Sequence, residues 1–352
     1  MVSRLSRIPA IAAILLPSLL VLSACSSSQQ VDAAGAAQSY DKTTKEACDA
    51  GAAEGELNYW SATDPGDFAK EIAPFQKAYP EIKVNFTSIR PTDATQKIIT
   101  EIQAGHQLDV DATSTDLPSA QPLFDRGAVV SVDWSKLDIP ENLQLDYNGV
   151  KIYRTLRDFI GIGYNPDQTP AAEVPSAWDE LVDPKFSGQI IVDPRGVYLT
   201  GLAVAWGEDK TLNWVKDLKE TSKPIVLQGA TDSIQKVVSG EAKITTSATT
   251  SAINAVKQTG APIEITYLDV VPSQDKYGVI LSGAQHPNAA ACFLSWFGGP
   301  EGQAQQLAVE YKGNSDKPAN LPPNVQLSVA DRPDQQEIFT SVGAEISEVL
   351  SK

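Results

Sequence analysis

The chain of 352 residues is poor in the residues that hold metals or activate nucleophiles, with only two histidines and three cysteines. His106 and His286 lie far apart, and no cysteine stands near either at the spacing of zinc ligands. The pattern Gly-x-Ser-x-Gly is also absent, and neither histidine has the surroundings of a catalytic base. We therefore expect no bound cofactor, no metal and no enzymatic activity.

Positive charge is also scarce, with 28 basic and 44 acidic residues and a net charge of −16. Nucleic-acid surfaces need clustered basic charge, and so does docking on anionic lipid, so neither partner is expected. Apolar runs are short as well. The longest, residues 11–22, is interrupted by Pro17 and Ser18 and falls below the roughly 20 residues that cross a bilayer.

That apolar run has the features of an export signal. Arg4 and Arg7 precede it and small residues follow, as in secretory signal peptides. The following Leu22-Ser23-Ala24-Cys25 resembles the bacterial lipobox. This resemblance implies cleavage after residue 24, lipidation of Cys25 and a membrane anchor outside the cytoplasm, or in the periplasm. The alternative is an ordinary cleaved signal with an incidental cysteine.

The expected mature chain begins with a tether and is long enough for two lobes. Residues 25–43 are small and polar, which predicts a flexible segment. The 328 residues from Cys25 onward exceed what one core usually supports. Cys48 and Cys292 have two interpretations, a disulfide or two buried free thiols, and the free thiols are slightly favoured.

Hydrophobic periodicity predicts alternating strands and helices. Apolar residues at i, i+4, i+7 and i+11 predict a helix over 67–79, and strands are expected at 57–60, 82–86 and 108–113. The alternation resumes after residue 189. Strands are expected at 189–192, 224–227 and 242–246, and helices at 198–206, 211–218, 232–238 and 251–258. This order is typical of α/β proteins with parallel sheets.

Four segments together carry a resemblance to a known family. The most specific is Pro175-Ser176-Ala177-Trp178-Asp179-Glu180-Leu181 with Asp183-Pro184-Lys185-Phe186-Ser187-Gly188. The others are 75–84, 161–165, and the pair 286–290 and 299–303. These segments resemble the bacterial extracellular solute-binding proteins of ABC importers, in the branch named for ferric-iron binders, and 161–165 resembles the family's first crossing between lobes. The branch also contains binders of phosphonates, sugar phosphates, thiamine and polyamines. Trp178 itself is expected in the core, because large aromatic side chains dominate buried area.

The resemblance implies a type 2 periplasmic-binding-protein fold, with two hinge-linked α/β lobes and a ligand cleft between them. Lobe one would hold 44–160 and 270–352, and lobe two would hold 161–269. The implied function is capture of a small solute by a monomeric receptor that delivers it to an ABC permease and its ATPase. Three alternatives stay open: a ferric-iron receptor, a receptor or adhesion lipoprotein of this fold that imports nothing and, less favoured, a surface hydrolase using carboxylates such as Asp64, Asp116 or Asp232.

Candidate ligand-binding residues follow from the rule that ligands sit beyond the carboxyl ends of parallel strands, near helix N-termini. Their loops are rich in hydroxyl groups and contain two arginines, which favours an oxyanion or a polyol bearing one. The first-lobe candidates are Trp60, Ser61, Thr63, Asp64, Ser88, Arg90, Thr113, Ser114 and Thr115. The second-lobe candidates are Arg195, Gly196, Thr231, Asp232, Ser233, Thr249, Thr250 and Ser251, with Tyr277 near the second crossing.

Each candidate type also has a structural interpretation. Serine, threonine and aspartate before a helix are mostly N-caps, worth about 1 kcal/mol each. Trp60 either stacks on a sugar or fills the core. Iron binding is disfavoured because residues 240–251, where the family's iron binders carry adjacent tyrosines, contain threonine and serine hydroxyls that do not deprotonate near neutral pH.

Overall fold

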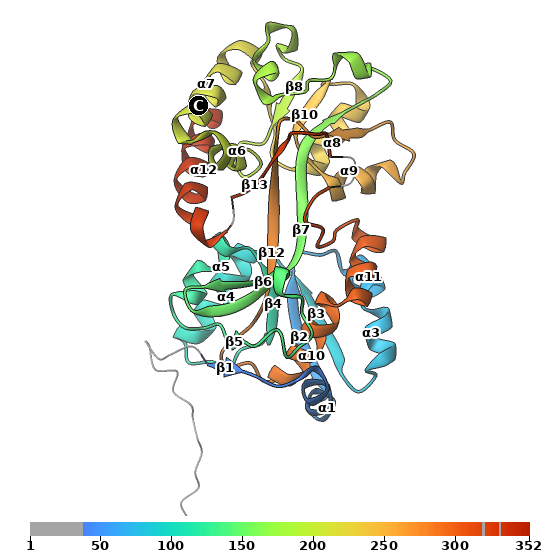
Figure 1. Ribbon diagram of the computed structural model, residues 1–352, viewed down its shortest axis with the longest axis vertical. Helices are drawn as coiled ribbons and strands as arrows, with labels where there is room; N and C mark the ends of the chain where they lie inside the picture. The colour runs from blue at the N-terminus through green and yellow to red at the C-terminus, as the bar shows by residue number, and fades with distance from the viewer. Residues whose placement is uncertain (1–37, 319–320, 331) are drawn as a thin grey trace, which may run out of the picture. The chain divides into compact units, whose positions relative to one another are not determined.

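The computed structural model describes residues 38–318, 321–330 and 332–352. The predicted signal peptide, Cys25 and most of the tether lie outside these residues. The predicted α/β class is confirmed: helices flank a continuous mixed sheet with the strand order β3-β2-β4-β12-β7-β10-β8-β9 (Figure 1). β11 and β6 pair with β7, and β13 pairs with β12.

The first half of this sheet is built on parallel strands. β2 pairs in parallel with both β3 and β4, as expected of strands joined through helices. The elements of this half are β1 (Ser39–Tyr40), α1 (Thr44–Glu54), β2 (Glu56–Ser61), α2 (Pro65–Glu71), α3 (Ala73–Ala78), β3 (Lys83–Ser88), α4 (Pro91–Gln103), β4 (Ala112–Thr115), α5 (Leu117–Phe124), β5 (Ser131–Val132), η1 (Glu141–Leu143), β6 (Gln144–Tyr147), α10 (Pro287–Gly298) and α11 (Pro300–Glu310).

The second half repeats the parallel arrangement, with β8 between β9 and β10. Its elements are η2 (Ala171–Glu173), η3 (Trp178–Val182), η4 (Pro184–Phe186), β8 (Ile190–Val192), α6 (Thr200–Trp206), α7 (Glu208–Asp217), η5 (Leu218–Ser222), β9 (Ile225–Val226), α8 (Ala230–Ser239), β10 (Ile244–Thr249), α9 (Thr250–Lys257), β11 (Glu264–Thr266), η6 (Pro333–Gln335) and α12 (Gln336–Ser351).

Two long strands, β7 (Val150–Tyr164) and β12 (Val270–Ile280), belong to both halves. They pair antiparallel with each other from Ser273–Phe159 to Gly278–Tyr153. β12 also pairs with β4 in the first half, and the end of β7 pairs with β10 in the second. Figure 1 shows them as the long green and orange strands. Near them, β13 (Gln326–Val329) adds a parallel strand to β12.

Each half has its own aromatic core. In the first, Tyr59, Phe68 and Phe293 are fully or almost fully buried, and their rings lie within 6.2 Å of one another. In the second, Trp178 is fully buried and its indole N–H donates to the carbonyl of Val270 at 2.8 Å. The expectation that Trp178 packs in the core is therefore confirmed.

The boundaries differ from the prediction at two elements. The helix predicted over 67–79 is two helices, because α2 ends at Glu71 and α3 starts at Ala73 with Pro74 in its first turn. Proline lacks the N–H that a continuous helix would need there. The strand predicted at 108–113 begins only at Ala112, so most of the predicted segment is a connection.

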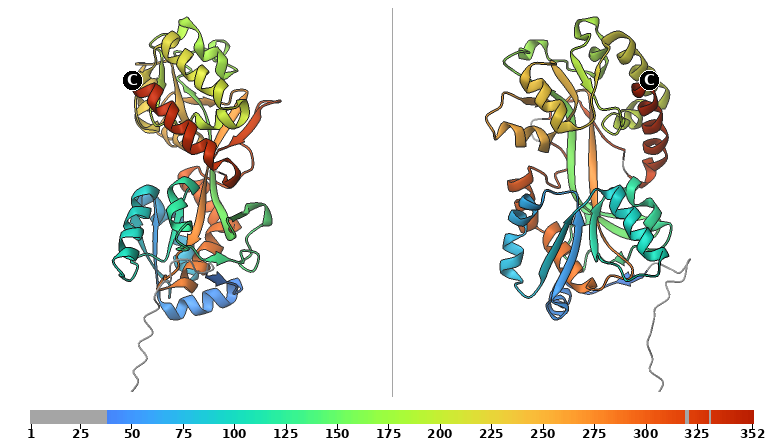
Figure 2. Two further views of the ribbon diagram at one scale, coloured as in Figure 1. Left: turned by 90° about the vertical axis from the view of Figure 1, so that its left-hand side faces the viewer. Right: turned by 180° about the vertical axis from the view of Figure 1, so that it is seen from behind.

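The C-terminal helix and the cysteines also differ from expectation. Residues 270–352 were assigned to lobe one, yet α12 packs on α6 and α7, and its Val342, Ile346 and Leu350 join the second core (Figure 2). A 3.6-residue apolar pattern shows that a helix has a buried face and does not show which core receives it. The slight preference for free thiols was wrong, because Cys48 on α1 and Cys292 on α10 form a disulfide.

Candidate functional site

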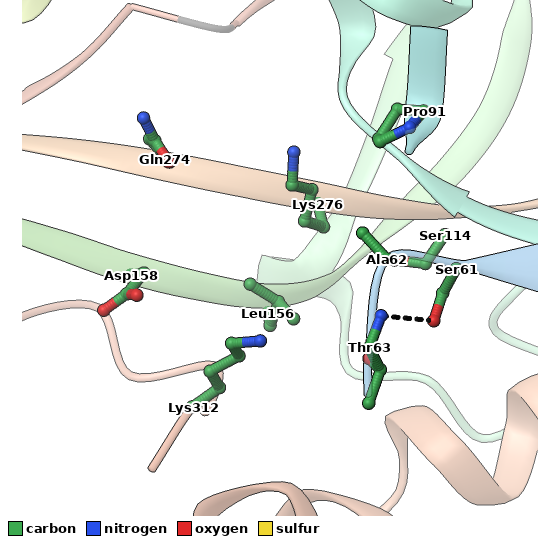
Figure 3. Close-up of a pocket in the computed structure, with 10 residues that line it drawn as sticks. All are labelled: Ser61, Ala62, Thr63, Pro91, Ser114, Leu156, Asp158, Gln274, Lys276 and Lys312. Carbon is green, nitrogen blue, oxygen red and sulfur yellow. Dashed lines mark hydrogen bonds between the residues drawn. The ribbon is translucent and has the colours of Figure 1, made fainter. Parts of the chain in front are cut away.

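A cavity of about 190 Å³ lies where β2 and β4 end and where β7 and β12 cross between the halves. It is smaller than the 300–1,000 Å³ usual for drug-sized ligands, so it suits a small solute. Ten residues line it: Ser61, Ala62, Thr63, Pro91, Ser114, Leu156, Asp158, Gln274, Lys276 and Lys312 (Figure 3).

Strand alternation explains which crossing residues face the cavity. Successive side chains of a strand point to opposite faces, so Leu156 and Asp158 share one face of β7. Gln274 and Lys276 share one face of β12 in the same way, and all four line the cavity. Asp275 and Arg157 are directly paired in the register and lie on the opposite face, where they line a separate cavity.

Two lysines carry positive charge at the cavity. Lys276 Nζ donates to Asp116 Oδ2 at 2.7 Å, and Lys312 Nζ donates to Glu310 Oε1 at 2.8 Å. Burial acts to raise the pKa of Asp116, but Lys276 and the hydrogen bonds from Ser119 together outweigh it, and the pKa lies below its ordinary value. In Figure 3 the Lys312 side chain extends toward Leu156 and Thr63.

Asp158 is the buried acid of the cavity wall. It lies on β7, and its carboxylate accepts hydrogen bonds from the backbone N–H of Ser251, at 3.1 Å, and from the Ser251 hydroxyl. Burial raises the pKa of Asp158, while the bonds from Ser251 and the charge of Lys312 oppose this rise. Because Ser251 lies in the first turn of α9, Asp158 ties the crossing strand to the second half.

Three predicted residues line the cavity: Ser61, Thr63 and Ser114. Ser61 Oγ accepts from the backbone N–H of Thr63 at 3.2 Å, which shapes the turn after β2. Ser114 Oγ lies 3.3 Å from Thr155 Oγ1, within hydrogen-bond distance. The cavity therefore presents hydroxyl groups from the first half beside the two ammonium groups.

Other first-half candidates lie away from the cavity lining. Trp60 is 2 % exposed in an apolar cluster, with Lys97 Nζ 4.4 Å from its ring centre, so it fills the core. Tyr277 is buried in the same cluster. Asp64 caps α2, Ser88 donates to the Thr63 carbonyl, Arg90 is exposed beside Asp93, Thr113 donates to the Trp60 carbonyl, and Thr115 is buried.

None of the second-half candidates lines the cavity, and most of them have structural partners. Arg195 makes a two-bond ion pair with Asp193, and Gly196, at φ +73°, packs against the carbonyl of Gly343. Thr231 and Asp232 are exposed on α8. Ser233 donates to the Gly229 carbonyl, Thr249 caps α9, and Thr250 lies 2.8 Å from the Tyr267 hydroxyl.

Sequence reasoning missed the charged residues of the cavity. Gln274 and Lys276 lie on one face of β12, and Tyr277 lies on the other. The two-residue period of a strand was therefore a signal for choosing Gln274 and Lys276 in place of Tyr277. Asp158 lies two residues after Leu156 on β7, so the same period places both side chains on one face. Lys312 lies in the irregular segment after α11, and no pattern in the sequence marks it.

Metal ligands and membrane spans were searched among the described residues. No group of three or more histidine, cysteine, aspartate or glutamate side chains there is arranged to hold a metal ion. No helix in the same part of the chain has the length and apolar character to cross a bilayer.

Comparisons with known proteins identify the family of this chain. A family model described as "Bacterial extracellular solute-binding protein" matches residues 70–326. An uncharacterized protein of Haemophilus influenzae is 32% identical over 158 residues, which are 41% of this chain. The match spans 44% of that protein, so this chain covers less than half of the curated relative's length.

Solved structures share the fold at low identity. Iron-bound HitA of Pseudomonas aeruginosa has a TM-score of 0.69 at 16% identity, over 84% of this chain and 99% of that one. AgtB of A. tumefaciens R10, in complex with agropinic acid, has a TM-score of 0.64 at 19% identity over the same shares. These likenesses support the predicted two-lobed periplasmic-binding-protein fold. Since the family model covers most of the chain, the chain belongs to the bacterial extracellular solute-binding proteins.

Proposed function

We propose that this protein is a non-catalytic receptor that captures a small anionic or hydroxylated solute between its halves and delivers it to the permease and ATPase of an ABC importer. The observation that carries the proposal is the cavity at the crossing strands, which combines hydroxyl groups with Lys276 and Lys312. An ammonium group has three N–H donors, and a carboxylate of the described chain engages one at each lysine. The remaining donors suit a carboxylate, phosphate or phosphonate oxygen.

Second-half loops would complete the site on closure. Hinge closure of two domains around a ligand is the established motion of periplasmic binding proteins. Arg195, Thr231 and Asp232 would then join Ser61, Thr63 and Ser114 at the solute. The Asp193 partner of Arg195 would orient its guanidinium group during that motion.

The solute class can be tested directly. Native mass spectrometry of the protein purified without refolding would weigh a co-purified solute. A thermal-shift screen of sugar phosphates, phosphonates, carboxylates and ferric citrate should then raise the melting temperature with one class, because a ligand that binds only the folded state stabilises it. No co-purified solute and no shift across the panel would overturn the proposal.

Matched variants locate the binding. Lys312→Met and Lys276→Met should each weaken solute binding about ten-fold or more, since a hydrogen bond to a charged group is worth about 1.5–3 kcal/mol. Lys83→Met removes the same charge from an exposed position on β3, away from the cavity, and should leave affinity unchanged. An equal loss of affinity in all three variants would mean that the net charge of the protein governs binding, and not contacts in the cavity.

Anchoring and delivery need their own tests. We propose that a lipid on Cys25 holds the monomeric protein at the outer face of the membrane or in the periplasm. Cys25→Ser should move the exported protein from the membrane fraction to the soluble fraction. Uptake of the identified solute should require this chain and ATP hydrolysis, and uptake that persists without the chain would contradict the delivery role.

A further inference from the structure

A buried acid lies behind the cavity, beside a second carboxyl group. Glu71, on α2, is 0 % exposed, and the side chain that it interacts with is the carboxyl group of Glu310. Among the described residues neither Glu71 oxygen has a hydrogen bond of ordinary geometry, and the buried hydroxyl of Tyr59, on β2, lies near the Ser114 side chain. Because buried polar groups are nearly always hydrogen-bonded, two adjoining carboxyl groups here need a physical explanation.

Glu71 connects to the cavity through a second carboxyl group. α2 packs against α11, whose last residue is Glu310. Glu310 Oε1 accepts from Lys312 Nζ at 2.8 Å, and Glu310 Oε2 accepts from Thr63 Oγ1 at 3.4 Å. Lys312 and Thr63 both line the cavity. A chain of polar groups thus runs from the buried Glu71 to the cavity wall.

Two carboxyl groups in such a place do not both ionise near neutral pH. Burial, followed by the negative charge of Glu310, raises the pKa of Glu71 to about 9. Lys312 acts in the opposite direction, and Asp67 adds a smaller upward effect. On β2, Tyr59 is uncharged, since burial raises its pKa as well. Neutral Glu71 therefore lies behind the ion pair between Glu310 and Lys312.

We propose that Glu71 is a positioning residue for the solute site. Glu71 stays protonated, so the pair of carboxyl groups carries one negative charge, which lies on Glu310 and holds Lys312 at the cavity wall. The inference rests on the proposed function only for the role of Lys312 toward the solute. Ionisation of Glu71 adds a second negative charge behind Lys312. That charge stabilises the ammonium form of Lys312 and repels an anion in the cavity.

The test detects the charge of Glu71 through the chemical reactivity of Lys312, and no solute is present. The full-length protein is acetylated with limiting acetic anhydride, which reacts with neutral amines, and labelling at Lys312 is measured by mass spectrometry relative to Lys276. Wild type and Glu71→Gln should give the same ratio at pH 7. At pH 10 the ratio should be about three-fold or more higher in Glu71→Gln, because the nearby carboxylate of the wild type favours the unreactive ammonium form of Lys312.

The control is Glu81→Gln, which removes an exposed acid at the start of the segment before β3. It should match the wild type at both pH values. Equal ratios in wild type and Glu71→Gln at pH 10 would overturn the inference. A difference already as large at pH 7 would overturn it too, because Glu71 would then be ionised under neutral conditions.

A second variant covers the case in which Glu71→Gln does not fold. Glu310→Gln removes the direct partner of Lys312 and should raise the labelling ratio at both pH values, and an unchanged ratio would overturn the inference. Because no solute is present, these results stand apart from the solute screen. A failed screen with the expected labelling would overturn the proposed function alone.

Discussion

Arg157 and Asp275 join the two crossing strands through a two-bond ion pair. Arg157 Nε lies 2.6 Å from Asp275 Oδ1, and Arg157 Nη2 lies 2.5 Å from Asp275 Oδ2. The residues are directly opposite in the β7–β12 register, and their side chains are only 12% and 2% exposed. The pair therefore fixes the strands on the face opposite the cavity.

Asp275→Asn should lower the free energy of unfolding by about 3–5 kcal/mol, because breaking a buried pair leaves an uncompensated charge. Urea denaturation of wild type and variant measures the loss. The control is Asp49→Asn, which breaks an exposed pair with Lys45 and should cost at most about 1 kcal/mol. Similar losses in both variants would show that burial does not govern the Arg157–Asp275 pair.

Local signals in the sequence were enough for the fold but not for its long-range connections. Periodicity located the alternating strands and helices, and the resemblance around residues 161–165 indicated a crossing between halves. The position of α12 and the bridge between Cys48 and Cys292 depend on which distant surfaces meet. Neither an apolar stripe nor a cysteine specifies its partner, so both expectations failed.

Three residues that line the cavity could be predicted because they lie at or just after the ends of strands. Ser61, Thr63 and Ser114 follow or end parallel strands, and they line the cavity. Asp64 and Thr249 also carry side-chain oxygens in similar places, yet they cap helices. Residue type does not separate these roles, because an oxygen that can bind a solute can equally accept a backbone N–H.

Trp60 offers a test of the structural role that its burial indicates. Trp60→Phe should lower the free energy of unfolding by about 1–3 kcal/mol, since it leaves space in the cluster around Ile98 and Leu117. Affinity for the identified solute, measured by calorimetry on folded protein, should change less than about two-fold. A loss as large as that of Lys312→Met would instead mean that the indole contacts solute.

The disulfide should matter for stability more than for binding. Replacing Cys48 and Cys292 together by alanine removes a link between residues 244 positions apart and should cost about 2–5 kcal/mol. Chemical denaturation with and without reductant measures it. Reductant should destabilise the wild type and leave the double variant unaffected. A wild type unaffected by complete reduction would contradict the prediction.

The buried acid predicts an unusual pH dependence of stability. The folded-state pKa of Glu71, about 9, lies above its ordinary value of 4.5. Its protonation therefore stabilises the folded protein fully below pH 4.5, and this contribution is lost as the pH rises toward 9. Glu71→Gln lacks this titration. Between pH 5 and pH 8, the free energy of unfolding of the wild type should fall by about 1–3 kcal/mol relative to the variant.

Urea denaturation of both proteins at pH 5, 6.5 and 8 measures this difference. Glu81→Gln, at an exposed position, should run parallel to the wild type across the same range. Parallel curves for wild type and Glu71→Gln would mean that Glu71 has an ordinary pKa in the folded protein. The carboxyl group would then be ionised beside Glu310 at neutral pH, and the charge balance that holds Lys312 at the cavity would not exist.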